Sequence, residues 1–290
     1  MNFFLNTELK VICQGFTGKS ATYHSKLSIN YGTNIVAGVT PQKGGSKHLD
    51  IPVFNTVTEA INETGGNTCL NFVPAQFCKD SIIEAINSGI KLIICITEGI
   101  PIHDMIQVKK IAKENKVVII GPNSPGFVIP ESCRLGIMPC NIHKPGNIGI
   151  ISRSGTLTYE AISQTTLAGL GQSISIGIGG DPIIGTNFID MLPYLENDKN
   201  TESILIIGEI GGNAEEIASD FIIKSIKKPV FAYISGIHAP FWKKMGHAGA
   251  IINKETESAQ NKINYLIKNK IKIITDVSKI GDSLKKKINN

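Results

Sequence analysis

One histidine in this sequence has neighbours that favour an exposed, reactive ring. His247 lies in the string MGHAGA (residues 245–250), where glycine and alanine leave no bulky side chain to bury it. An imidazole can attack a phosphoryl group through one ring nitrogen while a carboxylate holds the N–H of the other, which fixes the tautomer and the direction of attack. Glu209, in the glycine-rich string GEIGG (208–212), could supply that carboxylate. The alternative is that His247 is an ordinary loop histidine.

A phosphoryl group transferred in this way also needs a site for its negative charge. The segment 150–156, IISRSGT, predicts a strand that ends in hydroxyl side chains and a glycine at the start of a helix. The N–H groups and the dipole of a helix N-terminus stabilise an anion there. Ser154 can cap this helix, Gly155 would begin it, and Arg153 adds positive charge. These residues predict a phosphate-binding site.

A second glycine-rich turn follows the first strand of the chain, in the string CQGFTGKS (13–20). A Walker A loop and a GxGxxG dinucleotide fingerprint would both need glycine at residue 13, where the sequence has Cys13. What remains is a turn that feeds a helix N-terminus, which suits a phosphate. The alternative is that its glycines only permit the turn.

Polar residues also follow the next strands of this half. Lys43 stands beside two glycines in VTPQKGG (39–45), and Thr97 and Glu98 follow a buried strand in ITEG (96–99). A surface lysine and a helix cap would explain each of them separately. Together, strand ends that carry polar, glycine-flanked residues predict a nucleotide-type pocket.

The elements that must position these residues are parallel strands and helices in alternation. Nearly continuous apolar runs predict strands buried on both faces, and helical patterns separate many of them. This pattern predicts an α/β fold with doubly wound parallel sheets. Helical patterns include 254–268, and the expected strands are 10–14, 34–39, 68–73, 92–97, 117–120, 148–152, 173–178, 204–207, 230–235 and 271–275.

Five prolines between Gly121 and Gly146 interrupt this alternation. A proline-rich segment with little periodicity is typical of a connection between domains. We therefore expect one domain over residues 1–125, a connecting segment over 126–145 and a second domain over 146–290.

Composition limits the other functions that the chain could have. Hydrophobic residues make up 42% and charged residues 18%, as in ordinary globular proteins, and the net charge of +5 comes almost entirely from lysine. Without a basic stripe interleaved with aromatics, we expect no nucleic-acid partner. No apolar stretch is long enough for a membrane span. The six cysteines have no metal-ligand spacing, so we expect buried, reduced thiols and no metal. The predicted location is the cytoplasm, or the mitochondrial matrix if a leader has been removed.

The combined motifs resemble the α subunit of succinyl-CoA ligase (succinyl-CoA synthetase) over essentially the whole chain. The strings that carry the likeness are CQGFTG (13–18), GVTP (38–41), ITEGIP (96–101), SRSGTLTYE (152–160), GIGGDP (177–182) and GHAGA (246–250). The resemblance implies a Rossmann-like CoA-binding domain and a flavodoxin-like ligase domain. It also implies a β subunit of ATP-grasp fold, which would hold the nucleotide and Mg²⁺ in an αβ or α2β2 assembly.

The resemblance also assigns roles to individual residues. His247 would be the phosphorylated histidine, Glu209 its orienting carboxylate, and Tyr159 would lie beside the acyl substrate. Ser154 and Gly155 would receive the phosphate. The residues implied for CoA, which is a substrate, are Thr17, Gly18, Lys19, Ser20, Lys43, Ile96, Thr97 and Glu98.

The implied reaction converts succinyl-CoA, phosphate and a nucleoside diphosphate reversibly to succinate, CoA and a nucleoside triphosphate in the tricarboxylic acid cycle. Acetate or malate remain alternative acids, and the sequence leaves ADP and GDP open, because a partner would complete both pockets. A CoA-binding regulatory module would lack the His247 loop and the Ser154 helix start, and both are present. An NAD-dependent oxidoreductase would need the fingerprint that Cys13 interrupts.

Overall fold

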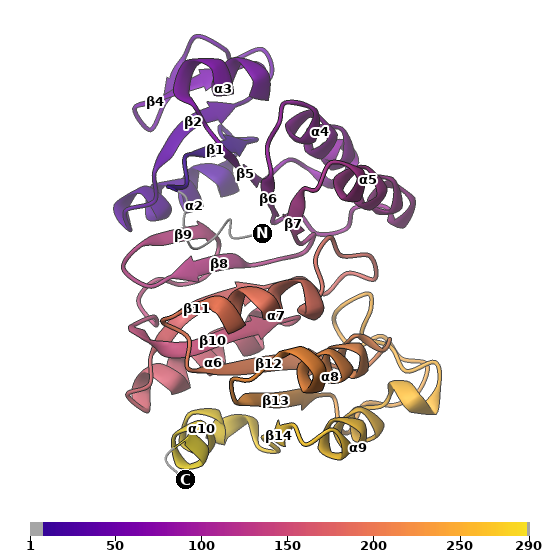
Figure 1. The fold of residues 1–290 in the computed structure, drawn as a ribbon. Coiled ribbons are helices and arrows are strands. Elements are labelled where there is room, and N and C mark those ends of the chain that lie inside the picture. Colours follow the sequence, from indigo (N-terminus) through magenta and orange to yellow (C-terminus); the bar gives the residue numbers. More distant parts are fainter. Residues whose placement is uncertain (1–7, 289–290) are drawn as a thin grey trace. The chain divides into compact units, whose positions relative to one another are not determined.

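Short runs of β-branched residues form two mostly parallel sheets, each belonging mainly to one part of the chain (Figure 1). The computed structural model describes residues 8–288. The chain divides into two units, one of residues 1–138 with 183–186 and the other of 139–182 with 187–290.

The sheet of the first unit has the strand order of a dinucleotide-binding fold. Its strands lie in the order β3-β4-β2-β1-β5-β6-β7, and all neighbours are parallel except β3 and β4. Without the short β3, this is the doubly wound order 3-2-1-4-5-6, which reverses direction between β1 and β5. The strands are β1 Val11–Gln14, β2 Ile35–Val39, β3 Lys47–His48, β4 Ile51–Phe54, β5 Thr68–Asn71, β6 Leu92–Cys95 and β7 Val118–Ile120.

Helices connect the parallel strands of this sheet. Helix α4 packs beside α5 (Figure 1), and a core of Ile, Val, Ala and Cys side chains joins these helices to the sheet. Helix α3 begins where Thr56 accepts a hydrogen bond from the N–H of Glu59, and it ends at Gly65 in the left-handed conformation. The helices are α2 Lys19–Asn30, α3 Val57–Thr64, α4 Ala75–Asn87 and α5 Ile102–Glu114.

The second unit has a flavodoxin-like sheet. Its strands lie in the order β14-β13-β12-β10-β11 and all are parallel. This is the doubly wound order 2-1-3-4-5, which reverses direction between β10 and β12. The strands are β10 Pro145–Ser152, β11 Gln172–Gly177, β12 Ser203–Glu209, β13 Val230–Ser235 and β14 Lys272–Ile273.

The helices of the second unit form two packed pairs, α6 with α10 and α7 with α8, and α9 contacts α8 (Figure 1). The segment 254–268, expected as one helix, is interrupted at Ser258. Its hydroxyl accepts a hydrogen bond from the N–H of Asn261 and so begins a new helix. The helices are α6 Gly155–Leu167, α7 Phe188–Asn197, α8 Ala214–Ser225, η1 Glu255–Glu257, α9 Ala259–Lys268, η2 Val277–Lys279 and α10 Ile280–Ile288.

The two strand orders confirm the predicted α/β fold class of doubly wound parallel sheets. Every strand range expected from the sequence overlaps a strand of the structure, but the short strands β3 and β4 were not expected. The proline-rich segment 126–145 contains an antiparallel hairpin that its pattern did not predict, formed by β8 (Gly126–Ile129) and β9 (Cys133–Gly136).

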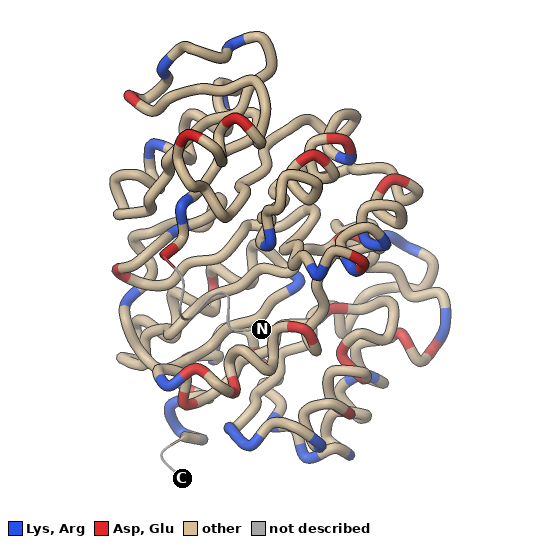
Figure 2. Tube along the Cα trace, turned by 45° about the horizontal axis from the view of Figure 1, so that its top comes forward, with Lys and Arg blue, Asp and Glu red and all other residues tan. Residues whose placement is uncertain are grey.

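The burial of the cysteines and the distribution of charged residues can be compared with the expectations from composition. Cys13, Cys69, Cys78, Cys95 and Cys133 are buried, as expected, whereas Cys140 is only partly buried, and burial raises the pKa of Cys13 to about 12. Basic and acidic residues are interspersed along the trace (Figure 2). Within residues 8–288, no helix is long and apolar enough to cross a membrane.

Leu205, at the centre of β12, tests the contribution of this packing. Its side chain is fully buried, so Leu205→Ala should lower the free energy of unfolding by about 2–5 kcal/mol. Leu167 ends α6 with 83% of its surface exposed, and Leu167→Ala should change that free energy by less than about 0.5 kcal/mol. Denaturant titration of both variants measures the difference, and equal losses would contradict this description of the core.

Candidate functional site

The reversal of strand order in the second unit brings the ends of β10 and β12 side by side. The backbone of Ser152, the last residue of β10, is paired with Ile207, two residues before the end of β12 at Glu209. Ligands of open parallel sheets bind beyond the carboxyl ends of the strands at such a reversal. The topology therefore places Arg153, Ser154 and Glu209 at the expected edge of the sheet.

The structure brings the two predicted catalytic residues together. Nδ1 of His247 lies 2.9 Å from Oε2 of Glu209, although 38 residues separate them in the sequence. The Glu209 side chain is 6% exposed and that of His247 is 27% exposed. An ionised carboxylate can only accept a hydrogen bond, so Nδ1 is the donor. Nε2 of the neutral ring then carries the lone pair that a nucleophile needs.

Glycine at position 180 leaves room for the His247 ring, and hydrogen bonds within the loop fix its turn. A Cβ atom on Gly180 would lie 2.4 Å from Cγ of His247, so no side chain larger than hydrogen fits there. The loop closes on itself where Met245 N–H donates to the carbonyl of Ala250 and Ala250 N–H donates to the carbonyl of His247. The GHAGA string therefore folds into a tight turn that packs on the GIGGDP string after β11.

The charges around His247 favour its protonated form. The hydrogen bond that Nδ1–H of His247 donates to Glu209 is the main cause that raises the pKa of His247, and the charges of Glu209 and Asp181 act in the same direction. Partial burial and the positive charge of Arg153 oppose them. The ring can attack a phosphoryl group only when Nε2 is unprotonated, so nucleophilic activity should increase as the pH rises through this pKa.

Arg153 contacts carboxylates instead of an open anion site. Its guanidinium lies 3.3 Å from Oε1 of Glu209 and 3.0 Å from Oε1 of Glu215. Lys262 is fully buried and completes the cluster at 2.5 Å from Oε2 of Glu215. The sequence reasoning missed Glu215 and Lys262. Lys262 had a detectable signal, because it interrupts the buried face that Ala259, Ile263 and Leu266 form on α9.

The predicted phosphate-binding residues begin a helix, as expected. Ser154 is the N-cap of α6, and its hydroxyl accepts a hydrogen bond from the N–H of Leu157. Gly155 is the first residue of that helix. Tyr159 lies one turn further along α6 and is half-buried.

In the first unit, Thr17 and Lys43 meet although they follow different strands. Nζ of Lys43 donates to Oγ1 of Thr17 at 3.1 Å, and the N–H of Thr17 points to Oγ1 of Thr40 at 3.4 Å. An ammonium group, a hydroxyl and a backbone N–H thus converge beyond the ends of β1 and β2. This arrangement suits a phosphate.

The loop after β1 ends in a helix whose N-cap is Gly18, which has no side chain to satisfy the first N–H groups of α2. Lys19 and Ser20 are the first two residues of that helix and are exposed. An uncapped helix N-terminus leaves its N–H groups and dipole for an anionic ligand.

The residues after β6 are placed less favourably than the sequence suggested. The hydroxyl of Thr97 donates a hydrogen bond to the carbonyl of Val73 at 2.6 Å. Ile96 is half-buried and Glu98 is exposed. The hydroxyl of Thr97 therefore ties two strand ends together, and Glu98 is the accessible polar side chain of this segment.

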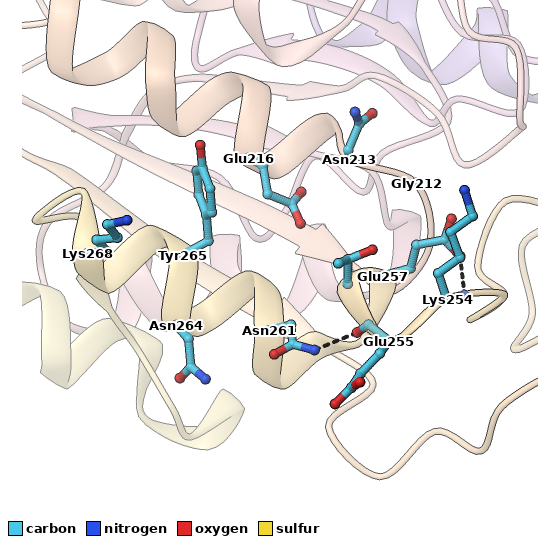
Figure 3. A pocket seen from close by; sticks show the side chains of 11 residues that line it. Gly212, Asn213, Glu216, Lys254, Glu255, Glu257, Asn261, Asn264, Tyr265 and Lys268 are labelled. Atoms are coloured by element: carbon cyan, nitrogen blue, oxygen red, sulfur yellow. Dashed lines mark hydrogen bonds between the residues drawn. The ribbon is translucent and has the colours of Figure 1, made fainter.

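A pocket of about 930 Å³ lies in the second unit between the turn before α8 and the helices η1 and α9 (Figure 3). Polar and charged side chains line it, including Glu216, Lys254 and Tyr265. The predicted site residues are not among its lining residues. In the described part of the chain, no cluster of His, Cys, Asp and Glu could hold a metal ion.

Two family models match the chain. The CoA binding domain model matches residues 6–99, and the CoA-ligase model matches residues 151–271. The first range contains the Thr17 and Lys43 loops, and the second contains His247 and its charged neighbours. The two folds and their sites therefore define a protein of the CoA-ligase class with a CoA-binding domain.

Curated relatives identify the family within this class. The succinate–CoA ligase (ADP-forming) subunit alpha of Aquifex aeolicus is 51% identical over 288 residues, which cover 99% of this chain and 94% of that protein. The subunit of the same name from Staphylococcus aureus (strain Mu50) is 49% identical over 284 residues, with 98% and 94% covered. The chain belongs to the family of succinate–CoA ligase α subunits, as the sequence motifs indicated.

Solved structures share the fold at lower identity. ATP citrate lyase of Methanosaeta concilii, in complex with (3S)-citryl-CoA, gives a TM-score of 0.88 at 22% identity over 96% of this chain and 49% of that one. A dinucleotide-forming acetyl-coenzyme A synthetase 1 from Ca. Korarchaeum cryptofilum gives 0.75 at 18% identity, covering 94% and 59%. The chain thus spans about half the length of these two larger proteins.

The His247–Glu209 contact predicts a change in titration. Glu209→Gln keeps an acceptor for Nδ1–H but removes the charge, so the pKa of His247 should fall. NMR titration of the ring Cε1–H measures it. Glu202→Gln is the control, because Glu202 is exposed and precedes the same strand. An unchanged pKa of His247 in Glu209→Gln would contradict the geometry.

Proposed function

We propose that the chain is the α subunit of a succinate–CoA ligase and that His247 carries the phosphoryl group between succinyl phosphate and a nucleoside diphosphate. The observation that supports this most directly is the 2.9 Å contact between Nδ1 of His247 and Glu209, which leaves Nε2 as the nucleophilic atom. Both curated relatives are named ADP-forming, which favours ADP over GDP as the acceptor.

The proposed reaction has three reversible steps. Phosphate attacks the thioester carbon of succinyl-CoA, so that the C–S bond breaks and CoA leaves as succinyl phosphate forms. Nε2 of His247 then attacks phosphorus, the P–O bond to succinate breaks, and succinate leaves. An oxygen of ADP attacks the phosphohistidine, and cleavage of the P–N bond gives ATP. A phosphoramidate retains enough transfer potential for the whole sequence to run in both directions.

Residues of this chain would serve these steps by position and charge. Glu209 holds the ring and stabilises the charge on Nδ1 as Nε2 attacks. Ser154 and Gly155, at the start of α6, offer N–H groups and a helix dipole to the phosphate. Tyr159, one turn along the same helix, is proposed to border the acyl substrate.

CoA is proposed to bind the first unit through Thr17, Gly18, Lys19, Ser20, Lys43, Ile96, Thr97 and Glu98. The contact between Thr17 and Lys43 and the uncapped start of α2 support the phosphate end of this site. We assign CoA binding to residues 1–125 and phosphoryl transfer to 146–290, with 126–145 as the connection.

A β subunit of ATP-grasp fold is proposed to bring the nucleotide and Mg²⁺, in an αβ or α2β2 assembly. The name alpha in the relatives supports a second subunit. These relatives come from bacteria, and the compartment that we propose is the cytoplasm.

Phosphate labelling tests the role of His247. Labelled ATP and Mg²⁺ should place acid-labile, base-stable label on this chain in complex with its β subunit. His247→Asn should abolish both the label and turnover while CoA binding remains. His238→Asn is the matched control, because His238 lies in an exposed loop of the same unit and should leave the label unchanged. Label that persists in His247→Asn, or label on serine, would refute the mechanism.

Calorimetry tests the CoA site. Thr17→Glu places a negative charge beside Lys43 and the start of α2, so CoA binding should weaken about tenfold or more. Thr58→Glu, on the exposed side of α3, should bind CoA as the unchanged protein does. Tighter binding of NAD than of CoA would instead favour an oxidoreductase.

A further inference from the structure

A chain of charged side chains leads from His247 into the core of the second unit. His247 contacts Glu209, the guanidinium of Arg153 lies between Glu209 and Glu215, and Glu215 contacts Lys262. Each separation is between 2.5 and 3.3 Å, and the five residues come from five different strand ends, loops and helices. At the far end, Lys262 also lies 3.3 Å from Glu216, whose side chain lines the pocket of Figure 3.

Stability alone does not account for these buried charges. Glu215 and Lys262 are both fully buried. Removing charges from water is costly, and apolar residues of similar volume often replace a buried ion pair without loss of stability. A buried pair is, however, well suited to fixing a geometry. The pair is joined to the candidate nucleophile through Arg153 and Glu209, and this connection favours that use.

The backbone holds Glu215 rigidly. It lies in the first turn of α8, and its Oε1 accepts a hydrogen bond from the N–H of Glu209 at 3.2 Å. A Cβ on Gly208 would lie 2.5 Å from Cγ of Glu215, so the absence of a side chain at Gly208 makes room for Glu215 against β12. Lys262 is held in turn by the carbonyl of Gly212 at 3.0 Å. Glu215, which contacts Arg153, is therefore fixed to the same strand end that carries Glu209.

Arg153 is the cation that faces the second oxygen of Glu209. Oε2 of Glu209 meets His247, whereas Oε1 is buried and accepts no hydrogen bond within residues 8–288. NH2 of Arg153 lies 3.3 Å from that Oε1. The charge of Arg153 is thus shared between Glu209 and Glu215. Arg153 interacts more strongly with Glu209 when another cation, such as Lys262, also neutralises Glu215.

We propose that Arg153 is a positioning residue for phosphoryl transfer. Anchored by Glu215 and Lys262, it holds Glu209 so that Oε2 meets Nδ1 of His247, and it keeps part of the Glu209 charge from His247. The inference rests on the proposed role of His247 as the phosphorylated residue. It adds Arg153, Glu215 and Lys262 to the machinery, although none of them needs to touch the substrate.

The electrostatic consequence has a definite sign. The groups that set the charge of His247 are Glu209 on β12, Arg153 after β10 and Asp181 after β11. Glu209 and Asp181 raise the pKa of His247, and Arg153 lowers it. If Arg153 is held less firmly beside Glu209, it neutralises less of the carboxylate's negative charge. Glu209 then stabilises the protonated ring of His247 more strongly. More of the ring is then protonated near neutral pH, where it cannot attack.

The charge-conserving variant Arg153→Lys tests this inference. An ammonium group lacks the planar fork that reaches two carboxylates at once. The NMR titration of His247 should therefore move to higher pH. Phosphorylation by labelled ATP in the αβ complex should slow roughly tenfold at pH 6 and stay within about twofold of the unchanged protein at pH 8.5. A merely structural role would lower the rate equally at both pH values.

A second pair of variants avoids reliance on Arg153 itself. Lys262→Met leaves Glu215 to Arg153 alone and should also move the titration of His247 to higher pH. Adding Glu215→Gln removes the excess charge and should restore the titration. Lys228→Met is the control, because Lys228 is a partly buried lysine of the same unit that bonds to carbonyls near α7. It should leave His247 unchanged.

The outcomes separate the two proposals. An unchanged His247 titration in folded Arg153→Lys or Lys262→Met overturns the positioning role. A uniform loss of rate with an unchanged titration also overturns it. If the unchanged protein takes no label on His247, the proposed function fails. The NMR titrations still decide whether Arg153 sets the charge of the ring.

Discussion

The contact between Nδ1 of His247 and the carboxylate of Glu209 is the interaction on which the candidate site of the second unit depends. It selects one tautomer, and only that tautomer leaves Nε2 able to attack. Bringing the two side chains together requires β12 to end at Glu209 beside the end of β10, and Gly180 to lack a side chain where the ring packs. The doubly wound strand order therefore contributes to the site, because its reversal leaves space at the strand ends in which the His247 loop packs.

The two proposed anion sites both lie at helix N-termini, but the two helices have different caps. Helix α2 begins after Gly18, which satisfies none of the first N–H groups, so more of them remain for a ligand that brings its own phosphates. Helix α6 begins after Ser154, whose hydroxyl bonds to the N–H of Leu157 and fixes the first turn. A fixed turn suits a phosphoryl group that must be received and released in one geometry.

The sequence was sufficient for the fold class, for the central strands and for placing Glu209 at the same sheet edge as the Ser154 helix start, because each depends on local patterns and on the rule that ligands bind at strand ends. It did not predict the short strands β3 and β4. It was insufficient for the hairpin of β8 and β9, whose four-residue strands lie in a segment dominated by prolines. It also missed the contact between Glu215 and Lys262, which are 47 residues apart and become neighbours only when α9 packs beside α8. A buried charge is visible in a sequence as an interrupted apolar face, but the pattern does not reveal its partner.

The charge balance of the cluster bears on why histidine suits this site. Arg153 and Lys262 face three carboxylates, Glu209, Glu215 and Glu216, so the cluster is already slightly negative before any phosphoryl group arrives. A phosphoryl group on Nε2 would bring further negative charge close to Glu209 and Asp181. Helix dipoles and the shared cations would oppose that repulsion. The proposed phosphohistidine would therefore be held without being strongly stabilised, and an intermediate that must pass its phosphoryl group in either direction requires that condition.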